Sequence, residues 1–174
     1  MRKLILFIIL VIPRTVSSQT WEVFTSDEIE YTVSYPVEWN AKMNDGAVPV
    51  FTSPSESVSD DFFENINIRY EKTQAYGENE KIADAGDATV DALKKAFNKF
   101  KLEKKDEQKL SGADGLELIY TGIHESLPDV KLRFIQRFYI VKSYLLIITY
   151  TAKAEKSNKW DTDAKRIMES VTFK

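Results

Sequence analysis

Two segments joined by only two residues constrain the fold of this chain more than any other feature. The first, 132–141, is a predicted strand with the apolar residues Leu132, Phe134, Phe138 and Ile140 on one face and Arg133 and Arg137 on the other. The second, 144–152, is apolar on both faces. The short connection at Lys142 and Ser143 permits only an antiparallel hairpin. We therefore expect 144–152 to be a central strand of a sheet that is covered on both sides.

Further strands are predicted in the part of the sequence that precedes this hairpin. The segment 29–35 alternates between apolar and polar residues and stops at Pro36, which cannot donate to a strand ladder, and Trp39 then turns back towards the sheet. Shorter strands are predicted at 47–51, 65–71 and 116–121, and 102–110 has the charged composition of an edge strand.

Helical spacing occurs twice. After a polar connection at 74–86, a helix is predicted from Asp87 to Phe100 with Asp87 as its cap, on an apolar stripe formed by Val90, Leu93, Phe97 and Phe100. A C-terminal helix capped by Ser157 or Asn158 is predicted from a second stripe, formed by Trp160, Ala164, Ile167, Met168 and Val171. The predicted fold class is α+β, with an antiparallel twisted sheet covered by helices in an α/β/α sandwich.

Residues 1–19 have the pattern of a secretory signal peptide, which leaves 20–174 as a single domain. Arg2 and Lys3 precede an apolar core at 4–12, and small residues at 16–18 precede a cleavage site that would place the mature start at Gln19 or Thr20. Nine apolar residues are too few for a membrane span, which needs roughly 20. The apolar core is followed by no cysteine, so we expect an exported protein, periplasmic or secreted, that is neither lipid-anchored nor membrane-spanning.

The charge balance excludes one class of partner. Removing residues 1–19 takes away three basic residues and no acidic one, so the formal net charge changes from -3 to -6. A mildly acidic chain of this kind does not have the basic character that is typical of nucleic-acid-binding proteins. The chain contains no cysteine, so packing without disulfides must stabilise the domain.

Several segments together resemble the PsbP-like family, which includes PsbP, DcrB and Mog-type α/β/α sandwiches. They are Tyr31-Thr32-Val33-Ser34-Tyr35-Pro36-x-x-Trp39, Gly115-Leu116-Glu117-Leu118, Ile147-Ile148-Thr149-Tyr150-Thr151-Ala152, and Trp160 with Ile167-x-x-Ser170-Val171-x-Phe173. The C-terminal segment departs from the family's Ser-Phe ending. The resemblance spans nearly the whole mature chain and implies a non-enzymatic binding or assembly module.

The candidate functional residues lie in two loops. His124, the single histidine, is followed by Glu125 and Asp129, but it has no second histidine, cysteine or nucleophile motif that would make a zinc site or a catalytic centre. Asp60, Asp61 and Glu64 lie in a polar loop without the spacing of a calcium-binding loop. We expect all six residues to form an interaction surface, and we predict no catalytic residue, cofactor or metal ligand.

The prediction is therefore an exported, non-catalytic module that acts on a protein partner in the cell envelope or outside the cell. One alternative is a small hydrolase or metal-dependent enzyme that uses His124 with loop carboxylates. The other alternative is a carrier of an apolar ligand held between sheet and helix. The oligomeric state is left open.

Overall fold

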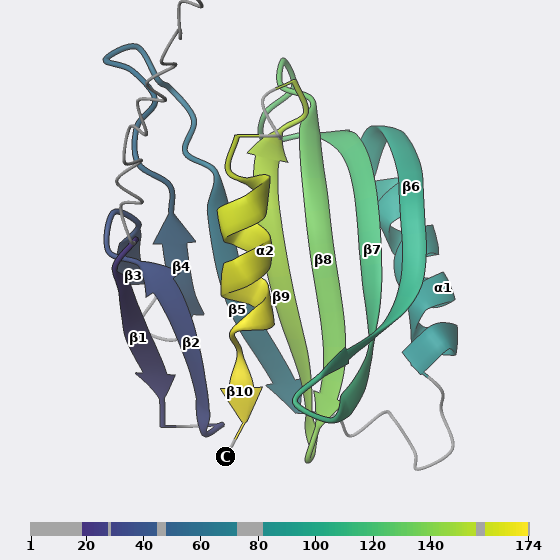
Figure 1. Cartoon of the computed structure of the whole chain (residues 1–174). Coiled ribbons are helices and arrows are strands. Elements are labelled where there is room, and N and C mark those ends of the chain that lie inside the picture. Colours follow the sequence, from purple (N-terminus) through teal and green to yellow (C-terminus); the bar gives the residue numbers. More distant parts are fainter. Residues whose placement is uncertain (1–18, 28, 45–47, 73–81, 156–158, 174) are drawn as a thin grey trace, which may run out of the picture.

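The computed structural model describes residues 19–27, 29–44, 48–72, 82–155 and 159–173, and it contains two antiparallel sheets and two helices (Figure 1). In chain order the elements are β1 (Trp21–Ser26), β2 (Tyr31–Pro36), β3 (Asn40–Asn44), β4 (Val48–Thr52), β5 (Asn65–Lys72), α1 (Ile82–Ala96), β6 (Phe97–Leu110), β7 (Ala113–His124), β8 (Leu132–Val141), β9 (Tyr144–Lys153), α2 (Asp161–Glu169) and β10 (Thr172–Phe173). Neither of the two helices is long and apolar enough to span a membrane.

The larger sheet confirms the predicted hairpin. Its strand order is β3-β4-β5-β9-β8-β7-β6, so β9 lies inside the sheet between β5 and β8. The ladder with β8 runs without interruption up to the pair of Val141 with Tyr144. Ile148 and Tyr150 are completely buried at the centre of β9, as expected for a strand that is covered on both faces.

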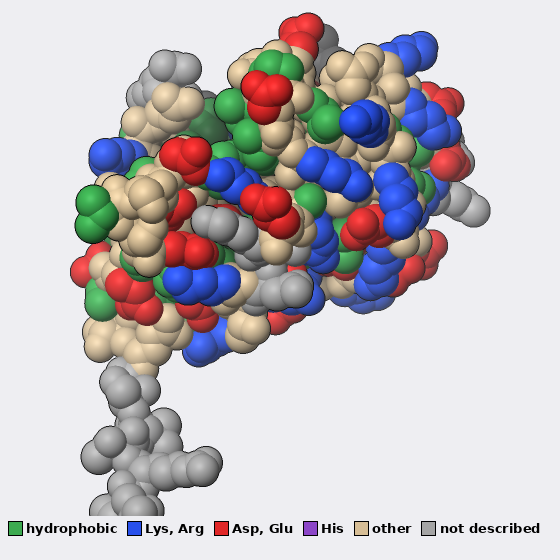
Figure 2. Space-filling model, turned by 90° about the horizontal axis from the view of Figure 1, so that it is seen from above, with side chains coloured by type: hydrophobic (Ala, Val, Ile, Leu, Met, Phe, Trp, Pro, Cys, Tyr) green, Lys and Arg blue, Asp and Glu red, His purple; other side chains and the backbone are tan. Residues whose placement is uncertain are grey.

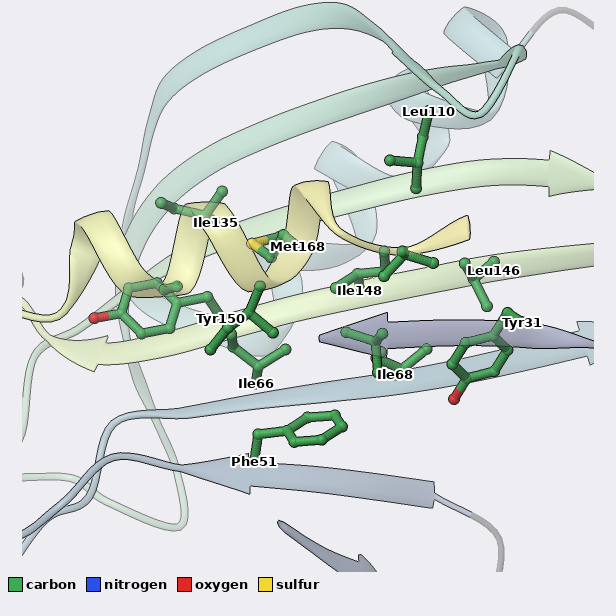
Figure 3. Packing of buried hydrophobic residues seen from close by; sticks show 14 of the residues in the cluster. Tyr31, Phe51, Ile66, Ile68, Leu110, Ile135, Leu146, Ile148, Tyr150 and Met168 are labelled. Carbon is green, nitrogen blue, oxygen red and sulfur yellow. The ribbon is translucent and has the colours of Figure 1, made fainter. Parts of the chain in front are cut away.

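One face of the larger sheet is covered by α2 together with the smaller sheet, which has the order β1-β2-β10 (Figure 1). Between these layers lies the main core, where Tyr31 of β2, Met168 of α2 and Ile66, Ile68 and Ile148 of the larger sheet pack together (Figure 3). The other face of the sheet packs against α1 through Val90 and Leu93. The α+β prediction, with a sheet covered by helices, is thus confirmed.

The boundaries predicted for the first helix are wrong. The helix α1 begins at Ile82, so part of the predicted connection 74–86 is helical, and Asp87 lies inside the helix instead of capping it. The helix ends at Ala96, and Phe97 and Phe100 belong to β6.

Tertiary packing explains the early end of α1. Phe97 pairs in register with His124 of β7, and its ring lies 5.8 Å from that of Tyr120 and 5.1 Å from that of Phe134. A Cβ atom at Gly122 would lie only 2.8 Å from Cβ of Phe97, so the glycine permits this close approach. Ladder hydrogen bonds and aromatic contacts therefore override the helical spacing of the sequence.

The C-terminal helix is confirmed, although its predicted caps Ser157 and Asn158 lie outside the described residues. Ala164, Ile167 and Met168 are the buried residues of α2. Trp160 occupies the N-cap position and is half-buried, with its ring 6.1 Å from that of Trp39 in an edge-to-face arrangement. After the helix, Ser170 anchors the chain to β2 because its hydroxyl donates to the carbonyl oxygen of Ser34 at 3.0 Å.

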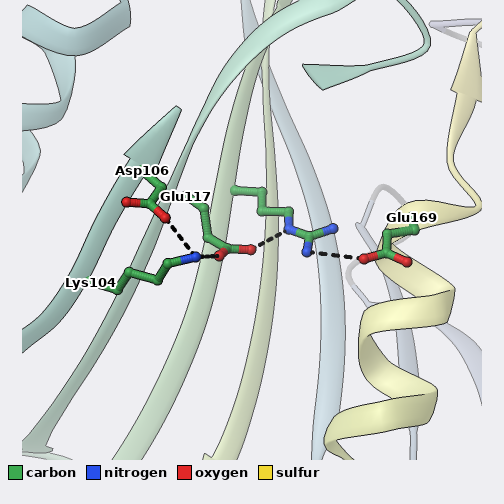
Figure 4. Close-up of polar contacts among 5 residues, drawn as sticks. Lys104, Asp106, Glu117 and Glu169 are labelled. Carbon is green, nitrogen blue, oxygen red and sulfur yellow. Dashed lines mark hydrogen bonds and ion pairs between the residues drawn. The ribbon is translucent and has the colours of Figure 1, made fainter. Parts of the chain in front are cut away.

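A row of charged side chains crosses the sheet from β6 to α2 (Figure 4). The buried carboxylate of Glu117 on β7 accepts a hydrogen bond of 2.7 Å from Nε of Arg137 on β8. Lys104 of β6 lies 3.4 Å from Glu117 and 2.7 Å from Asp106, and Arg137 reaches Glu169 of α2 at 3.6 Å. This row of ion pairs connects α2 to the edge strand β6.

Candidate loop interface

Three connections meet at the end of the larger sheet where β9 finishes, at the top of Figure 1. They are the β4–β5 loop (53–64), the β7–β8 loop (125–131) and the described residues of the β9–α2 connection (154–155 and 159–160). Together we call these residues the loop end. Three contacts hold them together: Lys153 with Asp61 at 2.5 Å, the indole Nε1 of Trp160 with Glu56 at 3.1 Å, and the backbone N–H of Ala154 with the carbonyl of Lys131 at 2.9 Å. Both sequence-predicted loops therefore belong to one surface.

The β4–β5 loop is held in one conformation by its own short-range hydrogen bonds. The backbone N–H of Glu56 donates to the Asp60 carboxylate at 2.9 Å, and the N–H of Asp60 donates to the carbonyl of Ser57 at 3.1 Å. These are the turn-forming bonds that Asp and Ser side chains favour. The hydrogen bond from Lys153 to Asp61 raises the pKa of the lysine, so this contact is a charge-assisted one.

Glu64 does not belong to the exposed surface, and its predicted place in an interaction loop is wrong. The residue is only 1% exposed, and its carboxylate accepts a hydrogen bond of 3.3 Å from the Ser53 hydroxyl. Burial raises the pKa of Glu64, and the nearby carboxylates of Glu56 and Asp60 raise it further. The N–H of Ser53 also donates to the Glu64 carbonyl at 2.8 Å, so this pair closes the base of the loop.

His124 stands at the end of β7, half-buried, and supports the turn that follows. Its ring lies 5.3 Å from the ring of Phe97. Nδ1 accepts a hydrogen bond of 3.3 Å from the backbone N–H of Ser126 and lies 2.7 Å from that residue's hydroxyl. In the part of the chain that the structure describes, the imidazole makes no hydrogen bond to Glu125 or Asp129, both of which are exposed. The contacts of His124 are those of a turn-stabilising residue.

Apolar side chains that the sequence analysis did not single out are exposed at the loop end. Six large hydrophobic residues are exposed in the described chain, and three of them lie on these two loops: Val58, which is fully exposed, Phe63 at 46% and Leu127 at 39%. Figure 2 looks onto this end of the molecule, where acidic, basic and hydrophobic side chains are intermixed. Apolar residues inside polar loops are visible in the sequence and could have indicated exposed apolar groups. The sequence does not, however, distinguish the exposed Phe63 from Phe62, which packs against the core.

A hollow of about 300 Å³ opens between the β7–β8 loop and the end of β9. It is lined by Asp129, Val130, Lys131, Lys153, Ala154 and Glu155, so the predicted residue Asp129 forms part of its wall. Carboxylates and ammonium groups both face it. A second hollow of about 160 Å³ lies at the opposite end of the sheet, between the β1–β2 and β8–β9 turns. Neither lies between the sheet and a helix, where an apolar ligand would be carried.

The residues of the loop end do not assemble a metal site. Among the described residues, no group of three or more histidine, cysteine, aspartate or glutamate side chains is placed to hold a metal ion. Asp60 and Asp61 are instead engaged with Glu56 and Lys153. The arrangement can offer a partner exposed apolar side chains with charged groups around them.

Comparisons with known proteins identify the fold. No protein-family model and no curated protein sequence matches the chain. Among solved structures, the chain is similar to cyanobacterial PsbP (CyanoP) from Synechocystis sp. PCC 6803, with 14% identity, a TM-score of 0.62, and 95% of this chain and 99% of that chain covered.

Two further structures have the same arrangement. LpqN of Mycobacterium tuberculosis gives 13% identity and a TM-score of 0.64 over 88% of this chain and 90% of that one. The Saccharomyces cerevisiae Ran-binding protein Mog1p gives 9% identity and a TM-score of 0.59 over 88% and 95%. At these identities the similarity is one of backbone architecture. The chain therefore has the PsbP/Mog-type fold that its sequence pattern predicted.

Proposed function

We propose that this protein is an exported, non-catalytic module that binds a protein partner in the cell envelope or outside the cell through its loop end. The observation that carries the proposal is the exposure of Val58, Phe63 and Leu127 on two neighbouring loops. Exposed apolar side chains set among polar groups at one end of a molecule are a candidate interaction surface.

The order of the loop end favours binding. The β4–β5 loop is fixed to β9 by the contact of Asp61 with Lys153 and to the start of α2 by the contact of Glu56 with Trp160. A surface that is already ordered loses less conformational entropy when a partner binds. The exposed acids Glu125 and Asp129 and the half-buried Asp60 add negative charge that would speed the approach of a basic partner.

The similar structures support a binding role. Mog1p is described as a Ran-binding protein, and LpqN is described as involved in cell envelope biogenesis. The first description is compatible with a protein partner, and the second with an envelope setting. Because a fold hosts many functions, the proposal rests on the loop end, and the neighbours are an analogy.

Export is proposed from the signal-like segment 1–19; the domain spans 20–174, and the mature chain begins at Gln19 or Thr20. Between the two predicted starts, the contacts of Gln19 favour cleavage before that residue. Its side-chain amide donates to Glu38 at 2.6 Å, and its oxygen accepts a hydrogen bond of 3.2 Å from Arg166. Intact-mass measurement of the exported protein tests this: a mass that begins at Gln19 is expected, and retention of Met1 on the soluble protein would contradict export.

A paired set of variants tests the binding surface. The triple variant Val58→Ser, Phe63→Ser, Leu127→Ser removes the exposed apolar groups of the loop end, whereas the control, Val37→Ser with Met43→Ser, removes exposed apolar groups elsewhere. Tagged wild type should capture a discrete protein from envelope extract, the control variant should capture it equally, and the triple variant should lose it. Equal capture by all three proteins would show that the loop end is not the binding surface. Circular dichroism of each variant checks that the fold is retained.

A further inference from the structure

The strand β1 leaves one side of its backbone without a strand partner. It is the outermost strand of the smaller sheet and pairs only with β2 among the described strands. All six residues pair in unbroken register, from Trp21 with Pro36 to Ser26 with Tyr31. A regular edge strand presents its outward N–H and C=O groups as a template for another strand.

The other sheet edges in the described chain are protected against such pairing. The edge strand β6 carries five lysines and two irregularities in its register with β7, at 98–101 and 102–104. The edge strand β3 has five residues and includes Lys42, and β10 has only two residues. Lysines, bulges and short length are the devices that natural edges use to prevent strand addition. The sequence of β1, WEVFTS, contains no lysine, arginine or proline, and its one charged residue, Glu22, accepts a hydrogen bond of 2.8 Å from the Tyr35 hydroxyl of β2.

The side chains of β1 also suit an added strand. Phe24 points into the core, with its ring 5.9 Å from that of Phe51. Trp21, Val23 and Thr25 alternate with it on the opposite face, and Val23 is 63% exposed, the highest value for a large hydrophobic residue in any described strand. An added strand would place its own side chains next to this row, where β-branched and aromatic cross-strand pairs are favourable.

Size and charge define the occupant. Six residues at about 3.4 Å each give an edge about 20 Å long and one strand wide. Such a strip is much smaller than the roughly 800 Å² per partner of a stable protein–protein interface, so a second copy of the chain would not be held by this edge alone. Arg166 lies 4.3 Å above the Trp21 ring at one end of β1, and the exposed Asp27 follows the other end. A short segment with one acidic end and one basic end would match both charges.

We propose that the outer edge of β1 is a docking site for an extended segment of a partner protein. The segment adds as a further strand, carries β-branched or aromatic residues at alternate positions, and bears an acidic residue at the Trp21 end and a basic residue at the Ser26 end. This is recognition by strand addition, in which backbone hydrogen bonds supply affinity and alternate side chains supply specificity. The site is separate from the loop end and does not depend on the function proposed for it.

Synthetic peptides test the proposal on the full mature protein. The peptides ETVTVTK and KTVTVTE place matching charges at the two ends in the parallel and antiparallel orientations, and ETVPVTK replaces the central threonine by proline, which removes a backbone donor. Hydrogen exchange of the backbone amides 21–26 is measured with and without each peptide. We expect at least one alternating peptide to slow exchange in β1, and the proline peptide to have no effect.

Two lysine substitutions at exposed valines complete the test. Val23→Lys places a charge on the edge strand and should weaken peptide binding at least tenfold, whereas Val37→Lys, at a residue 47% exposed in a turn, should leave binding unchanged. The triple loop-end variant should also bind the peptides normally. The proposal is overturned if neither alternating peptide protects β1 at millimolar concentration, or if Val23→Lys and Val37→Lys have equal effects.

Discussion

Replacing Arg137 by methionine should destabilise the protein by about 2 to 4 kcal/mol. The side chains of Glu117 and Arg137 are each only 6% exposed, and Nε of the arginine lies 2.7 Å from the carboxylate. Loss of one partner of a buried ion pair costs about 3 to 5 kcal/mol, because the remaining charge stays buried without compensation. Lys104 still lies 3.4 Å from Glu117, but its side chain is 45% exposed, so it recovers at most about 1 kcal/mol.

A second substitution separates the loss of a partner from the loss of packing. In the double variant Glu117→Leu, Arg137→Met no buried charge remains from this pair, so its stability should lie within about 1 kcal/mol of the wild type. Lys94→Met is the control, because it breaks an ion pair of 3.0 Å with Asp91 whose side chains are more than half exposed, and it should change stability by less than about 1 kcal/mol.

Urea unfolding followed by tryptophan fluorescence gives the free energy of unfolding for each variant. The expected order is wild type and double variant together, with Arg137→Met well below them. If Arg137→Met costs less than about 1 kcal/mol, or if the double variant is as unstable as the single one, the reasoning from a buried, mutually dependent pair is refuted.

Three further outcomes are expected. Ile148→Asp should prevent folding, since an unpaired charge at this fully buried position costs several kcal/mol against a total stability of about 5 to 15, and a soluble variant with an unchanged melting midpoint would contradict this. Burial raises the pKa of Glu64 in the folded state, so stability should fall as pH rises through that raised pKa. Glu64→Gln should flatten this pH dependence in melting temperatures measured from pH 4 to 8. Identical pH profiles for the variant and the wild type would count against a raised pKa at Glu64. His124→Ala should leave partner binding intact in the capture assay, because the imidazole supports a turn and packs beside Phe97, and loss of binding in a folded variant would show that His124 belongs to the binding surface.

Residues 132–153 show how far local sequence can determine this fold. The two-residue connection and the apolar character of both faces of 144–152 leave only an antiparallel hairpin with β9 inside the sheet, whatever surrounds it. The stripe of Ala164, Ile167 and Met168 likewise determines a helix that buries one face. These elements were predictable because their periodicity reflects burial directly.

Where a segment of the sequence fits both a helix and a strand, tertiary packing decides which of the two forms. Phe97 and Phe100 continue the helical stripe of Val90 and Leu93, yet both lie on β6, because the ladder with β7 and the space beside Gly122 accommodate Phe97 there. Gly122 is distant in sequence from the helix, so a prediction from local periodicity cannot take it into account. The end of α1 is therefore a property of the tertiary structure.

The candidate site divides in the same way. Its loops were predictable, because runs of serine, aspartate and proline between strands lie on the surface. Which side chains they expose was not: Glu64 is buried beneath Ser53, while Phe63 next to it faces solvent. The meeting of the β4–β5 and β7–β8 loops depends on β5 and β8 both flanking β9, and the unprotected edge of β1 depends on which strand ends the smaller sheet. The sequence by itself thus determined the central hairpin, the final helix and the surface position of the loops, since these follow from local periodicity and turn chemistry. Only the tertiary structure decided which loops meet and which apolar groups remain exposed, because both depend on strand order and on contacts between residues far apart in the chain.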